Sequence, residues 1–385
     1  MAFLFRNKTN SPPQLAKHLS ESLQKLLAEE QPSQKANELC ANYLSQMKIL
    51  MQGTPEIQVE PEQVFQCIQA LVQENLIRTL ARNIHRLPFE ARKDTQFIFG
   101  TAFRYKHPGS VTPEPDVLRF ILEQQPDVII ALCNGYMHRE SASPCGSILR
   151  EALKHEAVAH LILYDGQAED ERMLNLSSEV TSEPAKRNGV FWRFFDWIDK
   201  SAFEISSDAF NTFRDILTKH RDLVLEFLDL NFDDFFRTYH YKLIASDNYV
   251  TKRQSIKLLG EILLERAYYK IMSRYVAEPE HLKIIMNLMR DKAGMIKFES
   301  FHVFKIFVAN PKKSVGVQKI LILNRQALLK YLTTFCEDKN EDVQFTDEKG
   351  YLIQQLRNMP ERPVPPPTPA PSAAPAAPAP QAVQR

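Results

Sequence analysis

The sequence has 385 residues, of which 44% are hydrophobic and 25% are charged, proportions typical of a chain that folds around a large core. The 48 Lys and Arg side chains nearly cancel the 47 Asp and Glu side chains, and the net charge of +1 excludes the chain-wide positive surface that a nucleic-acid-binding protein needs. Only 11 glycines occur, about 3% against a usual ~7%, so helix is expected rather than the turns and bulges of a sheet-rich fold.

The start of the chain and its cysteines indicate a cytoplasmic protein. Residues Met1 to Arg6 lack a basic leader, and their apolar run is shorter than the roughly 7 to 15 residues of a signal-peptide core. No segment reaches the ~18 apolar residues of a membrane span. The five cysteines form an odd set without a C-x-x-C pair, as expected for reduced thiols: Cys40, Cys67, Cys133, Cys145 and Cys336.

Apolar residues recur at helical spacing up to residue 357, and almost no stretch alternates with the two-residue period of a half-buried strand. Breakers such as Glu278-Pro279 and Asn310-Pro311 separate the helical periods. The chain is therefore expected to be all-α. The expected helices include Pro13–Leu27, Pro61–Ala81, Val117–Cys133, Gly146–Leu163, Ala209–Thr218, Thr251–Leu264, His281–Arg290 and Met295–Ala309.

Three of these helices repeat one apolar pattern at intervals of 46 and 45 residues, each set following a small residue. The sets are Phe210, Phe213, Ile216 and Leu217; Ile256, Leu259, Ile262 and Leu263; and Phe301, Phe304, Phe307 and Val308. The interval fits the ~40 to 47 residues of HEAT and armadillo repeats. Residues 1–357 are therefore expected to form one right-handed helical-repeat solenoid, armadillo/HEAT-like and shaped as a curved rod. The alignment does not extend to the N-terminus.

The composition changes abruptly from residue 358. Residues 363–385 contain two isolated valines, many alanines and no aromatic residue, too little to bury, so residues 358–385 are expected to be a disordered Pro/Ala-rich tail. The spacings Pro363-x-x-Pro366 and Pro366-x-x-Pro369 would fit the aromatic groove of an SH3 or WW domain. A plain solubilising tail is the simpler interpretation.

Motifs that imitate enzymes lack essential parts. The run His220 to Leu223 has the letters of a kinase catalytic loop, but Phe227 stands where the metal-binding asparagine belongs, and no glycine-rich phosphate loop occurs. His155 and His160 are five residues apart, which turns them roughly 140° from each other on a helix, so they cannot share a zinc ion. The sequence predicts no catalysis, no metal site and no cofactor.

The second half contains several distinctive runs. They are Asn248-Tyr-Val-Thr-Lys-Arg-Gln-Ser-Ile-Lys-Leu-Leu-Gly-Glu, Leu288-Met-Arg-Asp-Lys, and Phe298-Glu-Ser-Phe-His-Val-Phe-Lys-Ile-Phe-Val-Ala-Asn-Pro311. These runs closely resemble the calcium-binding protein 39 family, also called mouse protein 25. The similarity extends less sharply back to Phe5, and the proline-rich extension resembles fungal members of the conidiophore-development (hymA) type.

The resemblance implies an armadillo-like scaffold without enzymatic activity. Such a scaffold binds and activates kinases of the STE20 or germinal-centre class, or their pseudokinases, in morphogenesis and polarity signalling, and it would be concentrated at sites of polarised growth or septation. Despite the family's name, no calcium loop is present, and no calcium site is expected. The competing hypothesis is a helical-repeat adaptor for non-kinase cargo whose tail recruits an SH3 or WW domain.

By matched positions, the resemblance assigns kinase contacts on a concave surface to Tyr249, Arg253, Lys257, Arg266 and Tyr269. Helical geometry examines the first three: with Tyr249 at 0°, Arg253 and Lys257 lie near 40° and 80°, whereas the apolar residues of the same helix sweep roughly 180° to 340°. Tyrosine and arginine often carry interface energy, although a merely solvated face has the same pattern. Tyr269 replaces the phenylalanine usual in animal members, which adds a hydroxyl.

The resemblance also implies a hydrophobic pocket for a short Trp-Glu-Phe peptide at the end of a pseudokinase, matched here by Lys283 and Met286. Methionine suits an adaptable pocket, and a lysine at its rim could face the peptide carboxylate. The alternative is that Met286 and Met289, three residues apart, are both core. The expected mechanism is a shift of the kinase population toward the conformation that the scaffold binds better.

Overall fold

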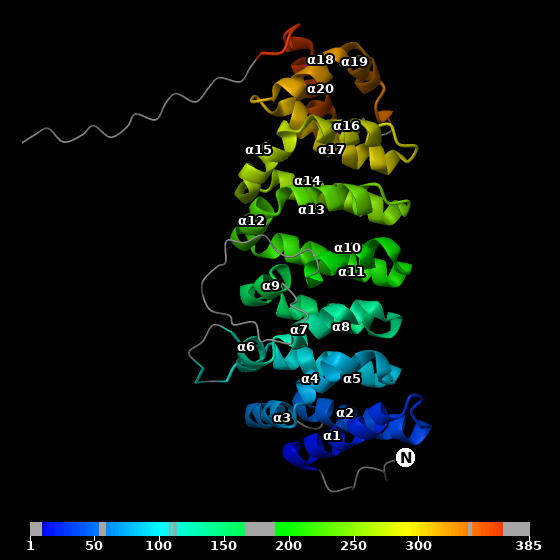
Figure 1. Ribbon diagram of the computed structural model, residues 1–385, viewed down its shortest axis with the longest axis vertical. Helices are drawn as coiled ribbons and strands as arrows, with labels where there is room; N and C mark the ends of the chain where they lie inside the picture. The colour runs from blue at the N-terminus through cyan, green and yellow to red at the C-terminus, as the bar shows by residue number, and fades with distance from the viewer. Residues whose placement is uncertain are drawn as a thin grey trace, which may run out of the picture. The chain divides into compact units, whose positions relative to one another are not determined.

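The computed structural model describes residues 10–53, 59–107, 109–110, 114–165, 189–337 and 341–364. These residues form twenty α-helices and no strand (Figure 1). The predicted all-α helical-repeat class is therefore confirmed, whereas the handedness and curvature of the array stay predictions. Residues 365–385, which hold most of the expected tail, lie outside the described residues.

The chain divides into two compact units, residues 1–271 and 272–385, and α15 (Tyr269–Ala277) runs across their boundary. The first unit contains α1 (Pro12–Ala28), α2 (Gln34–Gln52), α3 (Pro61–Gln73), α4 (Leu76–Asn83), α5 (Phe89–Ala102), α6 (Asp116–Gln124), α7 (Asp127–Asn134), α8 (Arg139–Ala152), α9 (Glu156–Leu163), α10 (Val190–Lys200), α11 (Phe203–Lys219), α12 (Arg221–Leu230), α13 (Phe232–Thr238) and α14 (Tyr249–Leu264). Short 3-10 or π segments join some of these helices: η1 (Ile84–Arg86), η2 (Gly135–Met137), η3 (Tyr239–Ile244) and η4 (Arg266–Tyr268). The second unit contains α16 (Pro279–Leu288), α17 (Gly294–Ala309), α18 (Val315–Leu323), α19 (Arg325–Thr333) and α20 (Val343–Asn358).

A ladder of helices runs through the first unit. Helices α2, α5, α8, α11 and α14 each pack against the next, in successive layers of Figure 1. Polar contacts hold the first turns of neighbouring helices together. Arg92 Nη1 of α5 donates to the Glu140 carbonyl of α8 at 2.9 Å, and Arg139 Nη2 of α8 donates to Glu204 Oε1 of α11 at 2.9 Å. The N-terminal ends of α5, α8 and α11 therefore lie along the same edge of the unit.

The sequence intervals between successive helices explain why the repeat is detectable in the second half of the chain and why it cannot be followed to the N-terminus. Helices α11, α14 and α17 begin at residues 203, 249 and 294, which are 46 and 45 residues apart, as predicted. Helix α8 begins at residue 139, 64 residues before α11, because a long stretch separates the end of α9 from Val190 at the start of α10. The irregular interval interrupts the apolar pattern toward the N-terminus.

Three of the predicted long helices are wrong, because the chain forms two separate helices in each of these ranges. Residues 61–81 break at Asn75, whose φ of 52° is left-handed, and residues 117–133 break at Pro126, which has no N–H to donate. Residues 146–163 break after Ala152, where Lys154 and His155 close a tight turn by hydrogen bonds to carbonyls three residues back.

Helix α8 also starts earlier than expected and continues through Pro144. Proline at this position cannot donate to the carbonyl of Glu140, four residues earlier. That carbonyl instead accepts the hydrogen bond from Arg92 of α5. The interruption inside α8 thereby supplies the acceptor that links two rungs.

Aromatic side chains fill the core beneath α11. Phe191 and Phe195 of α10, Phe213 of α11 and Phe227 of α12 are completely buried. The Phe191 ring centroid lies 5.5 Å from that of Phe213 and 4.9 Å from that of Phe227, within the range of favourable aromatic pairs. Burial of each ring contributes roughly 1.5–3 kcal/mol, so this packing stabilises the position of α11, on which α14 packs.

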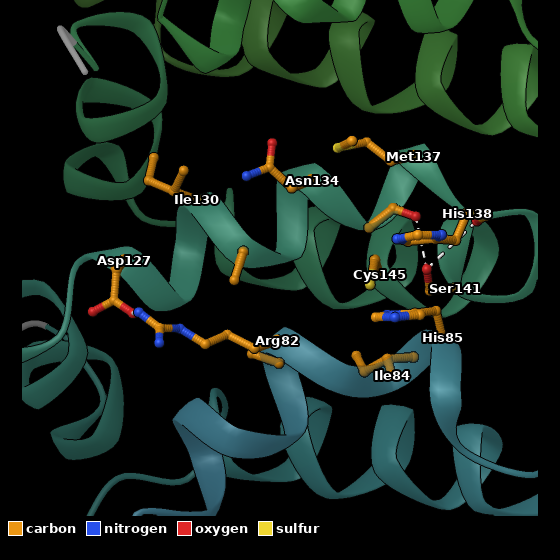
Figure 2. A pocket seen from close by; sticks show the side chains of 13 residues that line it. Arg82, Ile84, His85, Asp127, Ile130, Asn134, Met137, His138, Ser141 and Cys145 are labelled. Carbon is orange, nitrogen blue, oxygen red and sulfur yellow. Dashed lines mark hydrogen bonds and ion pairs between the residues drawn. The ribbon is translucent and has the colours of Figure 1, made fainter. Parts of the chain in front are cut away.

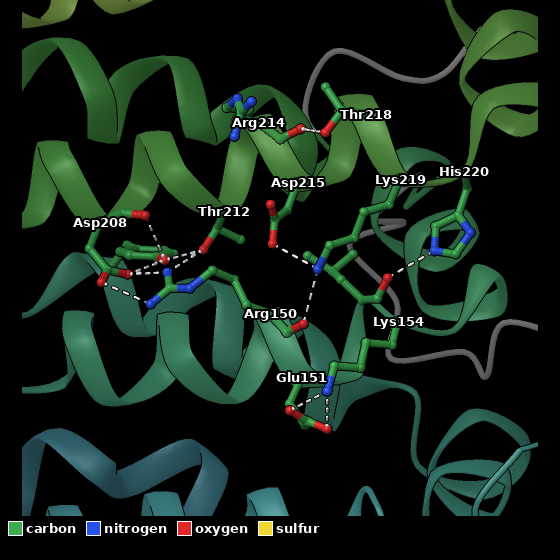
Figure 3. A network of polar contacts seen from close by, with 12 residues as sticks. Arg150, Glu151, Lys154, Asp208, Thr212, Arg214, Asp215, Thr218, Lys219 and His220 are labelled. Carbon is green, nitrogen blue, oxygen red and sulfur yellow. Dashed lines mark hydrogen bonds and ion pairs between the residues drawn. The ribbon is translucent and has the colours of Figure 1, made fainter.

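A buried polar network joins α8 to α11 (Figure 3). Asp208 Oδ1 accepts hydrogen bonds from Tyr136 Oη and Arg150 Nη1, both at 2.8 Å, and Thr212 Oγ1 lies 2.7 Å from Tyr136 Oη. Burial raises the pKa of Tyr136, and the Asp208 charge raises it further, so the phenol remains a donor. The network fixes the rotation of α11 relative to α8.

The second unit has its own core. The Phe301 ring of α17 lies 5.0 Å from that of Phe345 in α20 and 5.6 Å from that of Phe335. Helix α17 is also tied to α20 by Lys305 Nζ, which donates to both carboxylate oxygens of Glu348 at 2.8 Å. This core holds α16, which carries the predicted peptide-binding residues, through its contact with α17.

Candidate partner-binding surface

Helix α14 is positioned by a cap and by its apolar face. Asn248 Oδ1 accepts hydrogen bonds from the backbone N–H groups of Val250 (2.9 Å) and Thr251 (3.3 Å), which sets the helix start at Tyr249. The face predicted to be inward is at most 2% exposed: Ser255, Ile256, Leu258, Leu259, Ile262 and Leu263. The helical periodicity of this segment is therefore confirmed.

Tyr249, Arg253 and Lys257 follow one another by four residues along α14, and we call them the α14 stripe. Tyr249 is 46% exposed, Lys257 is exposed and Arg253 is half-buried. Each step of four residues rises about 6 Å along the helix. The structure thus places these three predicted residues in one row away from the core.

Acidic neighbours of the α14 stripe are already paired with other helices. Glu261 accepts from Arg214 Nη2 of α11 at 2.9 Å, and Glu265 accepts from Arg221 Nη2 of α12 at 3.1 Å. Lys257 and Arg266 have no ion-pair partner in the part of the chain that the structure describes. Because their charges are not neutralised locally, this surface favours a partner with acidic groups.

Arg266 and Tyr269 lie beyond the C-terminal end of α14, separated from Tyr249 by the length of the helix. The 16 residues of α14 span about 24 Å, so the five predicted residues form two groups rather than one cluster. Arg266 begins η4 and Tyr269, 62% exposed, begins α15. The adjacent Lys270 donates to Asp229 Oδ2 at 2.6 Å and is thereby held to α12.

Exposed apolar residues near the stripe were missed by the sequence analysis. Phe203, 58% exposed, and Val250 line a small cavity of about 40 Å³ between the first turns of α11 and α14. Tyr241 in η3, which packs against α14, is 80% exposed. Phe203 and Val250 thus add exposed apolar surface beside the first turn of α14, and aromatic residues are enriched in protein interfaces.

The enzyme-like motifs have structural roles. His220 lies between α11 and α12, and its Nε2 is 2.8 Å from the Leu153 carbonyl, so the kinase-like run is a helix junction, as expected. His155 precedes α9 and His160 lies within it. Within the described ranges, no three His, Cys, Asp or Glu side chains come together in a way that could hold a metal ion.

The two residues matched to a peptide pocket lie on α16. Lys283 is exposed, and its Nζ donates to Glu280 Oε1 of the same helix at 2.6 Å. Met286 is half-buried, whereas Met289 is 1% exposed and belongs to the core. The two methionines thus differ in accessibility, and Met286 alone presents part of its surface to solvent. Their role in peptide binding stays a prediction.

Among the described helices, none combines the length and apolar character needed to cross a bilayer. A family model described as Mo25-like matches residues 3–360. The conidiophore development protein hymA of Emericella nidulans is 49% identical over 367 residues, which cover 95% of this chain and 95% of that protein. The calcium-binding protein 39-like protein of Homo sapiens is 38% identical over 92% of this chain and 97% of its own length, and the Mo25-like protein of Schizosaccharomyces pombe is 38% identical over 93% and 100%.

Proposed function

The chain belongs to the Mo25-like family, and from this premise we propose that it is a non-catalytic scaffold that binds and allosterically activates protein kinases or pseudokinases of the STE20/germinal-centre type. The name of the Emericella relative refers to conidiophore development, which supports a role in morphogenesis or polarity signalling. We further propose that it acts in the cytoplasm, at sites of polarised growth or septation.

The α14 stripe carries this proposal. Tyr249 and Lys257 point away from a helix whose opposite face is completely packed, so their types are not required by the core. Exposed Phe203 adds an apolar group beside the first turn of α14, and Arg266 and Tyr269 form a second exposed group past the other end of the helix. A surface of this length, with aromatic groups and unneutralised cations, suits a folded partner better than a small ligand.

Activation follows from differential binding. A kinase domain exchanges between inactive and active arrangements, and a scaffold that holds the active arrangement tenfold more tightly shifts the equilibrium by at most about 1.4 kcal/mol. The buried core that supports α11 and α14 favours this mechanism, because a surface held in place by close packing discriminates between two shapes of its partner. The scaffold itself transfers no phosphoryl group.

Charge reversal on the stripe tests the proposal. Lys257→Glu should weaken binding of a cognate STE20-type kinase about tenfold or more and reduce its activation in parallel, because it places a negative charge in a cationic row. Lys17→Glu makes the same charge change at an exposed position of α1 and should leave both unchanged. Binding and activation that survive Lys257→Glu, Arg253→Ala and Tyr249→Ala would remove the stripe from the mechanism.

We propose a second contact through α16, where Lys283 and Met286 would receive the C-terminal peptide of a pseudokinase. Met286→Glu should abolish binding of a Trp-Glu-Phe peptide while the helical circular dichroism signal is retained, since Met286 is only half-buried. Met289→Glu is the contrasting variant, because a charge at this core position should unfold the second unit. Global unfolding of Met286→Glu would show that Met286 serves the core instead.

The adaptor alternative makes a different prediction about partners. Affinity purification of the full chain followed by mass spectrometry should recover STE20-type kinases or pseudokinases if the proposed function is right. Recovery of transport or RNA factors, or of SH3 and WW proteins that bind through residues 363–369, would favour the adaptor. Truncation after Val364 separates these outcomes, because it removes the proline-rich tail but no described helix.

A further inference from the structure

A cavity of about 340 Å³ lies in the first unit, away from α14 (Figure 2). Its lining comes from α4, η1, α7, η2 and the first turns of α8. The volume falls at the lower end of the range for ligand-binding pockets, which suits one compact chemical group rather than a large cofactor. Apolar lining residues form one part of the wall: Ala81, Ile84, Ile130, Ala131 and Cys145.

Hydrogen-bond donors gather on the polar part of the wall. The rings of His85 and His138 are stacked, with centroids 4.0 Å apart and planes 12° from parallel. In the described ranges, neither ring has a hydrogen-bond partner. Asn134 Oδ1 accepts from Arg193 Nη1 at 3.1 Å, which orients the Asn134 amide so that its NH2 group remains as a donor.

The charge around the cavity is positive. Asp127 Oδ2 accepts from Arg78 Nε at 2.8 Å and from Arg82 Nη2 at 2.9 Å, so two guanidinium groups share one carboxylate. Figure 2 shows Arg82 extended toward Asp127 along the wall of the cavity. One positive charge is left over at this end, while the two imidazoles offer further N–H donors at the other.

The side chains do not suit metal or thiolate chemistry. Burial, followed by the charge of Asp208, raises the pKa of Cys145 to about 12, so its sulfur remains a thiol near neutral pH. No three His, Cys, Asp or Glu side chains of the described ranges come together here to hold a metal ion. Ser141 Oγ is engaged as well, because it donates to the Gly135 carbonyl at 2.7 Å. The wall therefore offers donors and positive charge but few free acceptors.

We propose that this cavity binds an anion, a carboxylate or phosphate monoester carried on a short apolar or aromatic stem, with the anionic group on His85 and His138 and the stem against Ile84 and Ile130. Charge-assisted hydrogen bonds from imidazole groups are the strong contacts of such a site, the positive charge left over around Asp127 adds a weaker attraction across the cavity, and the apolar wall supplies burial for the stem. The same chemistry fits an acidic or phosphorylated side chain of a protein partner and a free small molecule. This site is independent of the α14 stripe.

Binding should be coupled to protonation. Burial lowers the pKa of His85, and the neighbouring His138 and Arg86 lower it further, while Glu140 partly opposes them. The ring is therefore neutral near pH 7 in the free protein, and Asp127 at the far side of the cavity is held by its two arginines. An anion beside the imidazoles favours their charged forms, so the ligand should bind more tightly at pH 6 than at pH 8.

Nuclear magnetic resonance of the histidine ring protons in the full chain tests the proposal. The probes are phenyl phosphate, benzoate and N-acetyl-phosphotyrosine methylamide, with benzyl alcohol as a neutral control. We expect saturable shifts of the His85 and His138 signals and a rise in their pKa with at least one anionic probe. Binding of the blocked phosphotyrosine would indicate a protein partner as the source, and binding of only the free acids would indicate a small molecule.

Variants of the two cavity histidines test whether the binding occurs in this cavity. His85→Gln and His138→Gln should each weaken binding about tenfold, the worth of one hydrogen bond to a charged group. His160→Gln replaces a half-buried histidine of α9 and should not change it. The proposal is overturned if no anionic probe shifts either signal at about 10 mM, tenfold above a 1 mM dissociation constant, or if binding survives both cavity variants.

Discussion

Arg150 of α8 and Asp208 of α11 form a two-pronged ion pair, with Nη1 at 2.8 Å from Oδ1 and Nη2 at 3.1 Å from Oδ2. Burial opposes the charge of Arg150, yet its hydrogen bonds to Asp208 raise its pKa above the ordinary value. The side chains are 28% and 16% exposed, so solvent screens the pair only partly. Because α14 packs on α11, this pair supports the platform of the proposed partner-binding surface.

Removing the acid of this pair should destabilise the first unit. Asp208→Ala leaves Arg150 and Tyr136 without their shared acceptor, and we expect a loss of about 2–4 kcal/mol in the free energy of unfolding. Glu204→Ala breaks the pair between Arg139 and Glu204, which joins the same two helices but is mostly exposed, and it should cost much less than Asp208→Ala. Urea unfolding of both variants measures the difference, and equal losses would contradict a buried network.

Gly146 is required by the same network. A Cβ atom at this position would overlap Asp208 Oδ1 and Tyr136 Oη, so Gly146→Ala should destabilise the protein by roughly 1–3 kcal/mol despite the better helix propensity of alanine. A Cβ atom added to Gly350 of α20 would meet nothing within 4 Å, and Gly350→Ala should stabilise the protein by up to about 1 kcal/mol. Opposite shifts of the thermal midpoint are the expected observation. Stabilisation by both variants would show that the network tolerates a methyl group.

Gln318 of α18 anchors the last described residue. Its Nε2 donates to the Val364 carbonyl at 2.8 Å, and its Oε1 accepts from the Val364 N–H at 2.9 Å. Gln318 as a whole is only 9% exposed. Gln318→Ala should therefore release the Val364 amide, and we expect its hydrogen-exchange protection to fall by tenfold or more. Gln344→Ala, at an exposed position of α20, is the matched control. Unchanged protection in Gln318→Ala would mean that Val364 is held by other contacts.

Helical periodicity predicted the fold class and the outward placement of the α14 stripe, whereas the role of its residues in partner binding was taken from the family resemblance and stays a prediction. In α14 the packed arc and the outward row follow from spacing alone, and buried Leu259 and exposed Lys257 lie where the spacing puts them. The break at Asn75 was not predictable in this way, because a left-handed residue other than glycine carries no periodic signal. Periodicity would also place Phe203 in the core, because it lies seven residues before buried Phe210 on the same side of α11, yet it is the first residue of the helix and is 58% exposed.

The cavity beside His85 was beyond sequence reasoning for a different reason. Its lining is spread from Ala81 to Cys145 over five elements, and only the packing of α4 against α7 brings these residues together. The stacking of His85 on His138 joins residues 53 positions apart with no shared motif. A resemblance to a family fixes matched positions, but it does not show which side chains meet in a pocket.

The ion pair between Lys305 and Glu348 should make the stability of the second unit depend on pH. Burial raises the pKa of Glu348, but the hydrogen bonds and charge of Lys305 outweigh it, and the net pKa is below the ordinary value. A carboxylate whose pKa is lowered by folding stabilises the folded state above its unfolded pKa of about 4.3, and this contribution is lost as pH falls through the folded pKa. The unfolding free energy of the wild type should therefore exceed that of Glu348→Gln near pH 7, and the two should converge below about pH 4.

Comparison with a surface pair distinguishes this linkage from general acid destabilisation. Glu280 pairs with Lys283 at 2.6 Å, but its side chain is 74% exposed, so the unfolding free energy of Glu280→Gln should run parallel to that of the wild type at every pH.

His302 lies 3.8 Å from the Glu348 carboxylate, and burial, followed by the charge of Lys305, lowers the pKa of His302. Its protonation in acid therefore adds a second positive charge beside Glu348. The gap between His302→Gln and the double variant His302→Gln with Glu348→Gln should consequently close at slightly higher pH, because the remaining carboxylate loses one cation that favours its ionised form. Denaturant unfolding at pH 7, 5, 4 and 3 measures all five proteins, and a constant gap between wild type and Glu348→Gln across this range would contradict the proposed linkage.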